Sequence, residues 1–536
     1  MFDQRWRSAW LIPLVLAAAL YLPGIGQRIL YTGDEARYAL LARTMVETGD
    51  WLVPRIDDEV HLEKSPLFIW AIAAFSLAGR QVTELTAVLP AALSAIAGVG
   101  ATFVLGRRLF GPRAGWLSAL VLVTACGYYW HARMALADMM VTAFAIGAAA
   151  AFATVVVSGE SRRWPMAVCW ACLGFGLSAK GPVALMPLIP FGIFLVWEHG
   201  WRGLGKLRPL VGVAVVALVS APWALAFALR SGESYVQSVI VADFVGPRLR
   251  AWDRAGELFF AAGPIGVGFM PWTPFLPSAL RQGWWRADDP GVRRRFRFLL
   301  LWVIVYVVVI TLLPHKRDRY LLATLPMLAI MVGWLWNRWA ERPSAVSLGL
   351  NAWIWAALGV AMAVAVLLPV RVRVELMALQ PATLSGRLVI AVMLLAAAAL
   401  VIANAWRGRA LATFAAICVP TLLLLAYEGR VYVKQHNRLF DIKSLAQRLA
   451  ARAAPGDRLT TFRSQNLALQ FYAGRPVART STPAELQSLA ADGRAVYVVA
   501  EERSWPDLAN TLPLRAVDET RIAGRRVLVA TTAVRP

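Results

Sequence analysis

Long hydrophobic runs separated by short polar stretches dominate the chain. A run of about 20 apolar residues is long enough to cross a bilayer as a helix. The run 67–79 is too short to span comfortably, so we expect a re-entrant or interfacial helix there. About thirteen spanning helices are predicted, over residues 8–26, 84–106, 114–131, 138–157, 164–179, 182–198, 209–228, 261–280, 297–313, 319–337, 348–369, 387–405 and 409–427.

The pattern changes after the last of these runs. Residues 430–536 are more polar, with short apolar segments between turn residues. Thr482 and Glu485 form a capping box, with Pro483 at the first helical position. We therefore expect a transmembrane domain with its loops over 1–429 and a small soluble α/β domain over 430–536. Two helices and two strands are expected in the second domain, over 442–453, 484–491, 494–500 and 526–531.

Composition supports a membrane protein and excludes an ordinary soluble enzyme. Of the 536 residues 59% are hydrophobic and 16% charged, whereas soluble domains are roughly half apolar and a quarter charged. The formal net charge is +23, with 55 basic and 32 acidic residues. In a soluble protein this excess would suggest nucleic acid. Here the excess of basic residues is explained by the positive-inside rule and by contact with membrane lipids. No nucleic-acid partner is therefore expected.

Basic clusters predict the orientation of the chain. They recur in alternate loops, as at Arg107 and Arg108 and at 293–297, which places the N-terminus in the cytoplasm. Counting 67–79 as a full span would put Arg107 and Arg108 outside and invert every later loop. The odd number of spans then places 430–536 in the periplasm.

The cysteines indicate no obvious chemistry. There are four, and all lie in apolar runs. Cys169 and Cys172 form a CxxC pattern, but no second pair accompanies it. Buried structural thiols are expected rather than a metal or redox site.

The first predicted outside loop carries the most informative polar residues. Thr32 and Glu35 make a capping box, so a helix begins here. Asp34 lies in its first turn, where the helix dipole favours an ionised carboxylate. Apolar positions further along indicate a helix on the membrane surface, with Arg37 and Tyr38 near its start. The alternative is that Asp34 and Glu35 only cap the helix.

A second polar cluster precedes the short apolar helix. Lys64 could snorkel to lipid headgroups or bind a phosphate as a point charge. His61 and Glu63 could share a metal ion, but two ligands are a weak signal. Asp138 lies at the end of a span, where a carboxylate is costly unless it is used or paired, and Arg133 is its expected partner.

Several motifs together resemble a known family. Asp34-Glu35-Ala36-Arg37-Tyr38-Ala39, Gly49-Asp50-Trp51 and Glu63-Lys64-Ser65-Pro66 are similar to motifs of the bacterial aminoarabinose lipid A transferases. These belong to the wider GT-C polyprenyl-phosphate glycosyltransferases, which include protein O-mannosyltransferases. Further matches follow in the same order over about residues 1–340: Ala179-Lys180-Gly181-Pro182, Pro271-Trp272-Thr273 and Lys316-Arg317-Asp318-Arg319-Tyr320-Leu321-Leu322. Two departures are Ser65, where the family has proline, and a missing histidine near 242–249, where Arg248 is kept.

The resemblance implies a GT-C fold and a glycosyltransferase activity. The implied reaction moves 4-amino-4-deoxy-L-arabinose or a related sugar from undecaprenyl phosphate to a lipid A phosphate at the periplasmic face of the inner membrane. Such lipopolysaccharide modification confers polymyxin resistance. A monomer is expected, and no cofactor is required, although a divalent metal stays open. The implied catalytic residues are Asp34, Asp138 and Lys64, and the implied substrate-binding residues are Glu35, Arg37, Tyr38, Glu63, Lys180, Arg248, Arg317 and Tyr320.

Two alternative functions remain at this point. One is another envelope-glycan glycosyltransferase, for example of the protein O-mannosyltransferase kind. The other is a lipid transporter or flippase, which the number of spans would fit. Few charges lie within the spans and no inverted repeat is evident, which argues against transport.

Overall fold

The computed structural model describes residues 10–57, 59–61, 65–157, 164–231, 260–312, 317–342, 345–368, 384–464 and 466–533. They form two compact units, and the chain passes between them more than once. The larger unit comprises Met1–Pro23, Leu62–Phe68 and Leu89–Gly429. The second comprises Gly24–His61, Ile69–Val88 and Arg430–Pro536.

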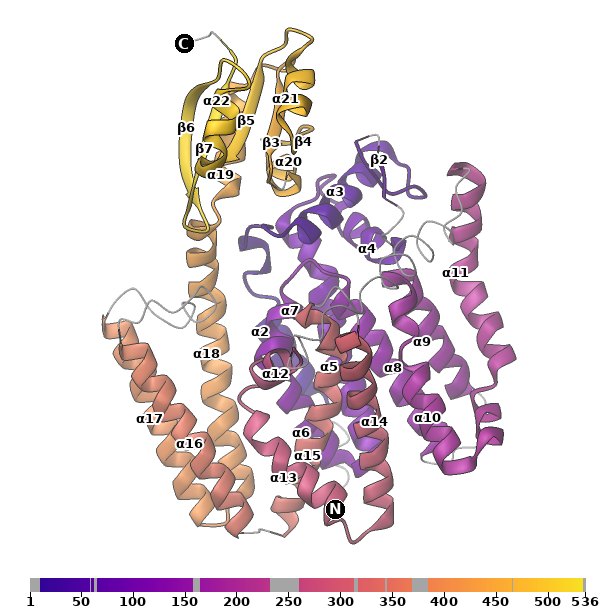
Figure 1. Ribbon diagram of the computed structural model, residues 1–536. Helices are drawn as coiled ribbons and strands as arrows, with labels where there is room; N and C mark the ends of the chain where they lie inside the picture. Colours follow the sequence, from indigo (N-terminus) through magenta and orange to yellow (C-terminus); the bar gives the residue numbers. More distant parts are fainter. Residues whose placement is uncertain are drawn as a thin grey trace. The chain divides into compact units, whose positions relative to one another are not determined.

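Helices make up most of the chain, which is a mainly α-helical, multi-pass membrane protein (Figure 1). Within the described residues, nine helical segments have the length and composition to cross a membrane. Nine of the predicted spans are thus found as long helices, because an uninterrupted apolar run leaves the helix as the only way to satisfy its backbone in lipid. These are α5 (Glu84–Phe110), α8 (Asp138–Val156), α9 (Trp164–Lys180), α11 (Pro209–Ser231), α14 (Pro290–Leu312), α15 (Leu325–Glu341), α16 (Ala345–Leu367), α17 (Leu384–Trp406) and α18 (Ala410–Leu439).

Four further apolar helices are shorter than the predicted runs. The run 114–131 is divided between α6 and α7 (Cys126–Ala132), because the chain leaves helical geometry at Thr124 and Ala125. The run 67–79 contains a helix of 11 residues, short as expected. The shorter helices are α2 (Leu11–Tyr21), α4 (Pro66–Ser76), α6 (Pro112–Val123) and α10 (Leu188–His199).

The prediction of one continuous helix over 261–280 is wrong. The segment is broken into α12 (Ala262–Gly266), a 3₁₀ turn and α13 (Leu276–Leu280). Prolines at 264, 271, 274 and 277 remove backbone donors and clash with a preceding turn. Gly268 also packs backbone to backbone against Gly127, whose N–H donates to the Gly268 carbonyl at 2.7 Å. The broken backbone is therefore satisfied by protein contacts.

Two kinds of packing hold the larger unit together. Small residues allow close helix contacts: a Cβ added to Gly333 of α15 would lie 2.3 Å from the Ser118 hydroxyl of α6. Buried aromatic rings fill the wider gaps. Trp272 stacks on Phe414 with ring centroids 5.0 Å apart and meets Trp336 edge-on at 6.4 Å.

The second unit contains a five-stranded sheet of order β4-β3-β5-β7-β6. The strands β4, β3 and β5 are parallel, whereas β7 and β6 continue the sheet antiparallel. The two predicted strands are confirmed as β5 and β7. The strands β3, β4 and β6 were not predicted; β4 is very short and β6 is largely polar. The strands are β3 (Arg458–Phe462), β4 (Ala478–Thr480), β5 (Val496–Glu501), β6 (Arg515–Ile522) and β7 (Arg525–Thr531).

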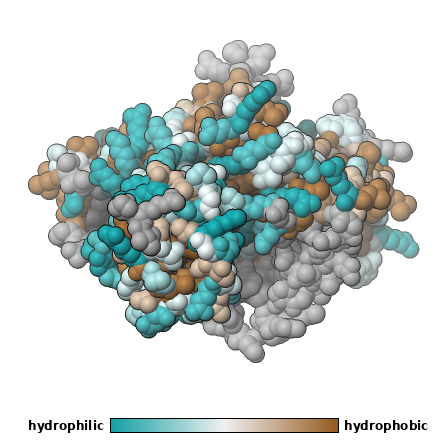
Figure 2. Space-filling model, turned by 90° about the horizontal axis from the view of Figure 1, so that it is seen from above, coloured by the Kyte–Doolittle hydropathy of each residue, from teal (hydrophilic) through white to brown (hydrophobic). Residues whose placement is uncertain are grey.

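Helices cover both faces of this sheet. Side chains alternate along β5, so Tyr497 and Val499 face one core and Val496 and Val498 the other. The first core is covered by α19 (Ile442–Arg452) and α20 (Leu467–Ala473), and the second by α21 (Pro483–Ala490) and α22 (Trp505–Ala509). The predicted helices α19 and α21 are confirmed. The view from above shows many hydrophilic side chains on the surface (Figure 2).

The first loop packs into the same unit as the C-terminal sheet. It contains helix α3 (Gly33–Thr48) and a small antiparallel pair, β1 (Arg55–Ile56) and β2 (Glu59–Val60). Ile29 and Ala36 are part of the core formed by α19, α20 and the sheet. Gln470 of α20 donates to both carboxylate oxygens of Asp57, at 3.0 and 2.9 Å. The second unit is thus assembled from segments that are far apart in the sequence.

Candidate active site

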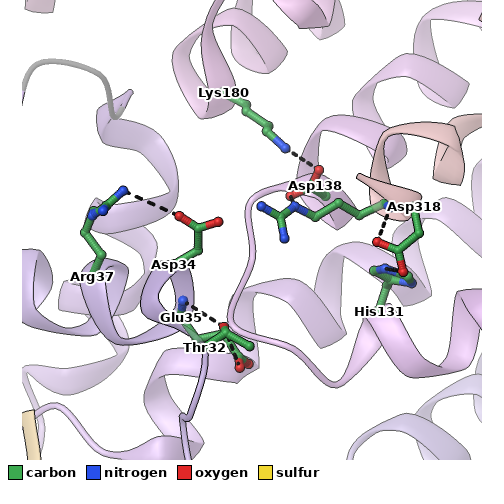
Figure 3. Close-up of polar contacts among 9 residues, drawn as sticks. Thr32, Asp34, Glu35, Arg37, His131, Asp138, Lys180 and Asp318 are labelled. Atoms are coloured by element: carbon green, nitrogen blue, oxygen red, sulfur yellow. Dashed lines mark hydrogen bonds and ion pairs between the residues drawn. The ribbon is translucent and has the colours of Figure 1, made fainter. Parts of the chain in front are cut away.

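The start of α3 holds Asp34 in a defined position. Thr32 caps the helix as predicted, and its hydroxyl oxygen accepts from the Glu35 N–H at 3.3 Å. Asp34 lies in the first turn and forms an ion pair with Arg37 at 3.5 Å (Figure 3). Both side chains are a little over a quarter exposed. The capping box therefore fixes a partly accessible carboxylate on a helix N-terminus, where the dipole stabilises its charge.

Glu35 points into the unit instead of toward solvent. Its carboxylate is fully buried and pairs with Arg28, which is also buried. Burial acts to lower the pKa of Arg28, but the adjacent Glu35 carboxylate outweighs it and holds the pKa above its ordinary value. Tyr38 is likewise buried. Both side chains thus lie in the interior of the second unit. Their binding of substrate stays a prediction.

The sequence-based reasoning missed Arg28. It follows the first apolar run by only a few residues and precedes the capping box, a position that also suits an arginine at a membrane boundary. The neighbouring Ile29 N–H donates to the Asn437 side chain at 3.0 Å, and Asn437 donates to the Gln27 carbonyl at 2.7 Å. The segment before α3 is therefore fixed by the end of α18. A contact between residues about 400 positions apart leaves no local sequence signal.

In the larger unit, Asp138 sits between two cations. It begins α8, and Lys180 from the end of α9 forms an ion pair and hydrogen bond with its carboxylate (Figure 3). Arg319 Nε lies 3.5 Å from the other carboxylate oxygen. The side chain of Asp138 is 7% exposed, whereas those of Lys180 and Arg319 are 21% and 17% exposed. The cluster carries a net positive charge and remains partly open to solvent.

The turns around this cluster explain how the three side chains converge. Gly181 adopts φ +76°, a left-handed conformation that glycine accepts without steric cost, and it ends α9 directly after Lys180. Pro182 is the second residue of the 3₁₀ turn Gly181–Leu185 that follows. Another 3₁₀ turn, Asp318–Thr324, contributes Arg319 and Tyr320. The Lys180 ammonium lies 4.9 Å from the centroid of the Tyr320 ring, a cation–π distance.

His131 and Asp318 extend the polar cluster. His131 Nε2 is 3.9 Å from the Asp318 carboxylate, and the Arg319 N–H donates to Asp318 at 2.8 Å. His131 Nδ1 lies 2.7 Å from the Gly127 carbonyl, which can only accept, so Nδ1 carries a proton. Arg317, the candidate phosphate ligand next in the chain, is exposed. Among the described residues, its chain neighbours Asp318 and Arg319 are the ones with contacts to the cluster.

Arg133 was expected to pair with Asp138, but its hydrogen bonds run elsewhere. Its guanidinium donates to the backbone carbonyls of Leu20 and Tyr21, at 3.3 and 3.0 Å. It also interacts electrostatically with the buried Glu428 of α18. The cationic partners that the structure gives Asp138 are Lys180 and Arg319.

Three predicted site residues lie outside the described residues: Glu63, Lys64 and Arg248. Their roles stay predictions. Because Glu63 is one of them, the weak metal pair with His61 is not tested either. Among the residues that the structure does describe, no three His, Cys, Asp or Glu side chains come together as a metal site.

The arrangement is suited to anionic substrates. A buried carboxylate holds Lys180 and Arg319 in place, and both cations can also meet a phosphate group. In the second unit, Asp34 and Arg37 of α3 form a separate pair of a carboxylate and a cation. Such groups can stabilise a leaving phosphate and orient a sugar or its acceptor.

A family model for dolichyl-phosphate-mannose-protein mannosyltransferases matches residues 63–225. Curated relatives extend the similarity. The undecaprenyl phosphate-alpha-4-amino-4-deoxy-L-arabinose arabinosyl transferase of Pectobacterium carotovorum is 28% identical over 66% of this chain, which spans 63% of that relative's length. The Aeromonas hydrophila protein of the same name is 26% identical over 97% of this chain and 98% of its own length. The predicted resemblance to the aminoarabinose transferases is thereby confirmed.

Solved structures show the same fold. The crystal structure of ArnT from Cupriavidus metallidurans in the apo state superimposes with a TM-score of 0.79, covering 98% of both chains at 22% identity. The structure of that protein bound to undecaprenyl phosphate gives a TM-score of 0.76 over 97% of both chains. The whole architecture, including the C-terminal sheet, is therefore shared with ArnT.

Proposed function

We propose that the protein transfers 4-amino-4-deoxy-L-arabinose, or a related sugar, from undecaprenyl phosphate to a phosphate of lipid A. The observation that carries this proposal is the similarity to the Aeromonas transferase along nearly the whole of both chains. The Asp138 cluster supports it, because Lys180 and Arg319 converge there and both cations can contact a phosphate-bearing substrate. A lipid flippase would need neither a carboxylate poised at the start of α3 nor this clustered charge.

The proposed chemistry is a direct displacement at the anomeric carbon. An acceptor oxygen attacks that carbon, the bond to the phosphate oxygen breaks, and undecaprenyl phosphate leaves with the bonding electrons. Lys64 and Arg248, with Arg317, are assigned to the leaving phosphate, whose charge grows in the transition state. Asp34 orients the acceptor, or removes its proton if it is a hydroxyl. A single displacement inverts the anomeric configuration.

The proposed setting is the bacterial inner membrane, with the N-terminus in the cytoplasm and the reaction at the periplasmic face. The support is the alternation of basic loops along the sequence. In this arrangement residues 1–429 form the catalytic membrane domain and residues 430–536 a periplasmic domain. The protein acts as a monomer with membrane lipids, the donor and the acceptor as its partners.

Purified protein supplied with undecaprenyl-phosphate aminoarabinose and lipid A should add one aminoarabinose residue, measured by mass spectrometry. The linkage should have the inverted configuration by NMR. Parallel reactions with undecaprenyl-phosphate mannose and a serine- or threonine-containing peptide test the mannosyltransferase alternative. Movement of donor across vesicles without any transfer, or a product that retains configuration, would contradict the proposal.

Asp138→Asn should reduce transfer by about 100-fold or more, because Lys180 and Arg319 would lose the charge that positions them. The measurement is initial rate at saturating donor, corrected for folded protein. Glu198→Gln is a matched control, since Glu198 also holds two arginines, Arg294 and Arg297, at 2.7 and 2.6 Å. Equal losses of specific activity in both variants would show that Asp138 has only a structural role.

A further inference from the structure

A cavity in the C-terminal sheet domain lies at a position that favours ligand binding. It measures about 230 Å³ and is lined by Phe462, Arg463, Glu501, Arg503 and Ser504. Phe462 ends β3 and Glu501 ends β5, and these two parallel strands are neighbours in the sheet. The cavity therefore opens at the carboxyl ends of adjacent parallel strands.

The chain connections that leave β3 and β5 run over opposite faces of the sheet. The chain leaves β3 through α20, which covers one face of the sheet, and leaves β5 through α22, which covers the other. The strands that come next in the chain also lie on opposite sides, since β4 flanks β3 whereas β6 lies beyond β7, on the side of β5 away from β3. Connections that diverge in this way leave a crevice at the strand ends, which is where open α/β sheets bind their ligands.

The local backbone supports a specialised role for Arg463. It has φ +52°, a left-handed conformation that non-glycine residues adopt at a cost. Its guanidinium donates to Asp507 at 2.6 Å and to the Ser481 carbonyl at 3.2 Å, and it lies 4.8 Å from the centroid of the Phe462 ring. These contacts hold the arginine over the strand end.

The charges around the cavity fit a phosphorylated sugar. Arg463, Arg503 and Arg525 outnumber the two carboxylates that they contact, Glu501 and Asp507. These ion pairs are largely exposed, so each contributes little and can be exchanged for a phosphate. Glu501, already neutralised by Arg503 and Arg525 at 2.7 and 2.8 Å, can accept from sugar hydroxyls.

We infer that this crevice between β3 and β5 is a second ligand site, which binds the phosphate of a phosphorylated sugar through Arg463 and Arg503. The volume is smaller than that of typical drug-sized pockets and suits a compact polar group. The phosphorylated sugar can be a free metabolite or the head of a glycolipid. Nothing in this inference depends on the proposed transfer reaction.

The test uses the full chain in nanodiscs and isothermal titration calorimetry with glucosamine 1-phosphate. Saturable binding is expected, with glucosamine at least about tenfold weaker, because a charge-assisted contact to phosphate is lost. Nanodiscs containing lipid A, compared with phosphatidylglycerol alone, identify the source. Competition by lipid A indicates a glycolipid head, and unchanged binding indicates a free sugar phosphate.

Variants locate the binding in this crevice. Arg463→Gly and Arg503→Gln should each weaken binding by about 10- to 100-fold. Glycine suits the left-handed backbone at 463, so the first variant should fold at least as well as the original protein. Arg494→Gln, an exposed arginine paired with Asp492 near the opposite ends of the strands, is the control and should bind normally. No saturable binding of the sugar phosphate, or equal binding by all three variants, would overturn the inference.

Discussion

Asp34→Asn is expected to lower transfer to lipid A by about 100- to 10,000-fold, the range over which positioned acids and bases act. The substitution keeps the size of the side chain and leaves the Thr32 cap of α3 untouched. It removes the negative charge at the first turn, which would deprotonate a hydroxyl acceptor or orient a cationic sugar. The protein should therefore insert and fold normally. The measurement is kcat and KM with purified donor and lipid A.

Glu47→Gln is the matched control for this experiment, because Glu47 is an exposed carboxylate near the other end of the same helix. It should leave both constants unchanged. A loss confined to kcat would identify Asp34 as a base, whereas a rise confined to KM would identify it as a binding group. Normal turnover by Asp34→Asn would remove Asp34 from the catalytic site.

Much of the fold could be predicted because its cause is local. An uninterrupted apolar run has to become a helix in lipid, and a side chain such as Thr32 or Thr482 satisfies free N–H groups whatever lies further away. The motif that contains Lys180 was located in the sequence by its resemblance to the family's motif, and its Gly181 adopts the left-handed conformation where α9 ends. These features need only neighbouring residues.

Other features depend on distant partners, which the sequence pattern does not show. The breaks in 261–280 could have been anticipated from its prolines, but the close approach of Gly127 and Gly268 could not. The last run was predicted to end at 427, yet α18 continues to Leu439. The last turns of α18, from Arg430 onward, are polar and belong to the second unit. Edge strands such as β6 lack clean alternation, since much of their side-chain surface stays exposed.

The candidate site also combines features that the sequence predicted with contacts between distant residues that it did not. Asp138, Lys180 and Arg319 were each noted from the sequence, but Arg133, five residues before Asp138, was the expected partner. Closeness in the sequence did not identify the partner of Asp138. The Arg133 guanidinium points toward the backbone carbonyls of Leu20 and Tyr21 and donates its hydrogen bonds to them. The residues that do pair with Asp138 come from 42 and 181 positions away along the chain. Convergence of this kind requires the fold.

The buried pair of Arg28 and Glu35 should dominate the stability of the second unit. Glu35→Gln leaves the Arg28 guanidinium buried without a counter-charge, which is expected to cost about 3–5 kcal/mol. The free energy of unfolding, followed by urea titration and limited proteolysis of the C-terminal segment, measures this loss. Arg526→Gln is the control, because its pairs with Glu502 and Glu519 are exposed to solvent and should contribute little to the free energy of unfolding.

A double variant separates a requirement for charge from a requirement for packing. Arg28→Met combined with Glu35→Leu replaces the ion pair by apolar side chains and should recover most of the stability lost in Glu35→Gln, because no charge is then left unpaired. The same variant should still begin α3 at Thr32, whose hydroxyl caps the helix through the backbone N–H of residue 35. Asp34 would thus keep its place in the first turn of α3. If the double variant were as unstable as the single one, Arg28 and Glu35 would be needed for their hydrogen bonds to the Ile29 carbonyl and the Thr32 hydroxyl, and the unpaired charge would not explain the loss.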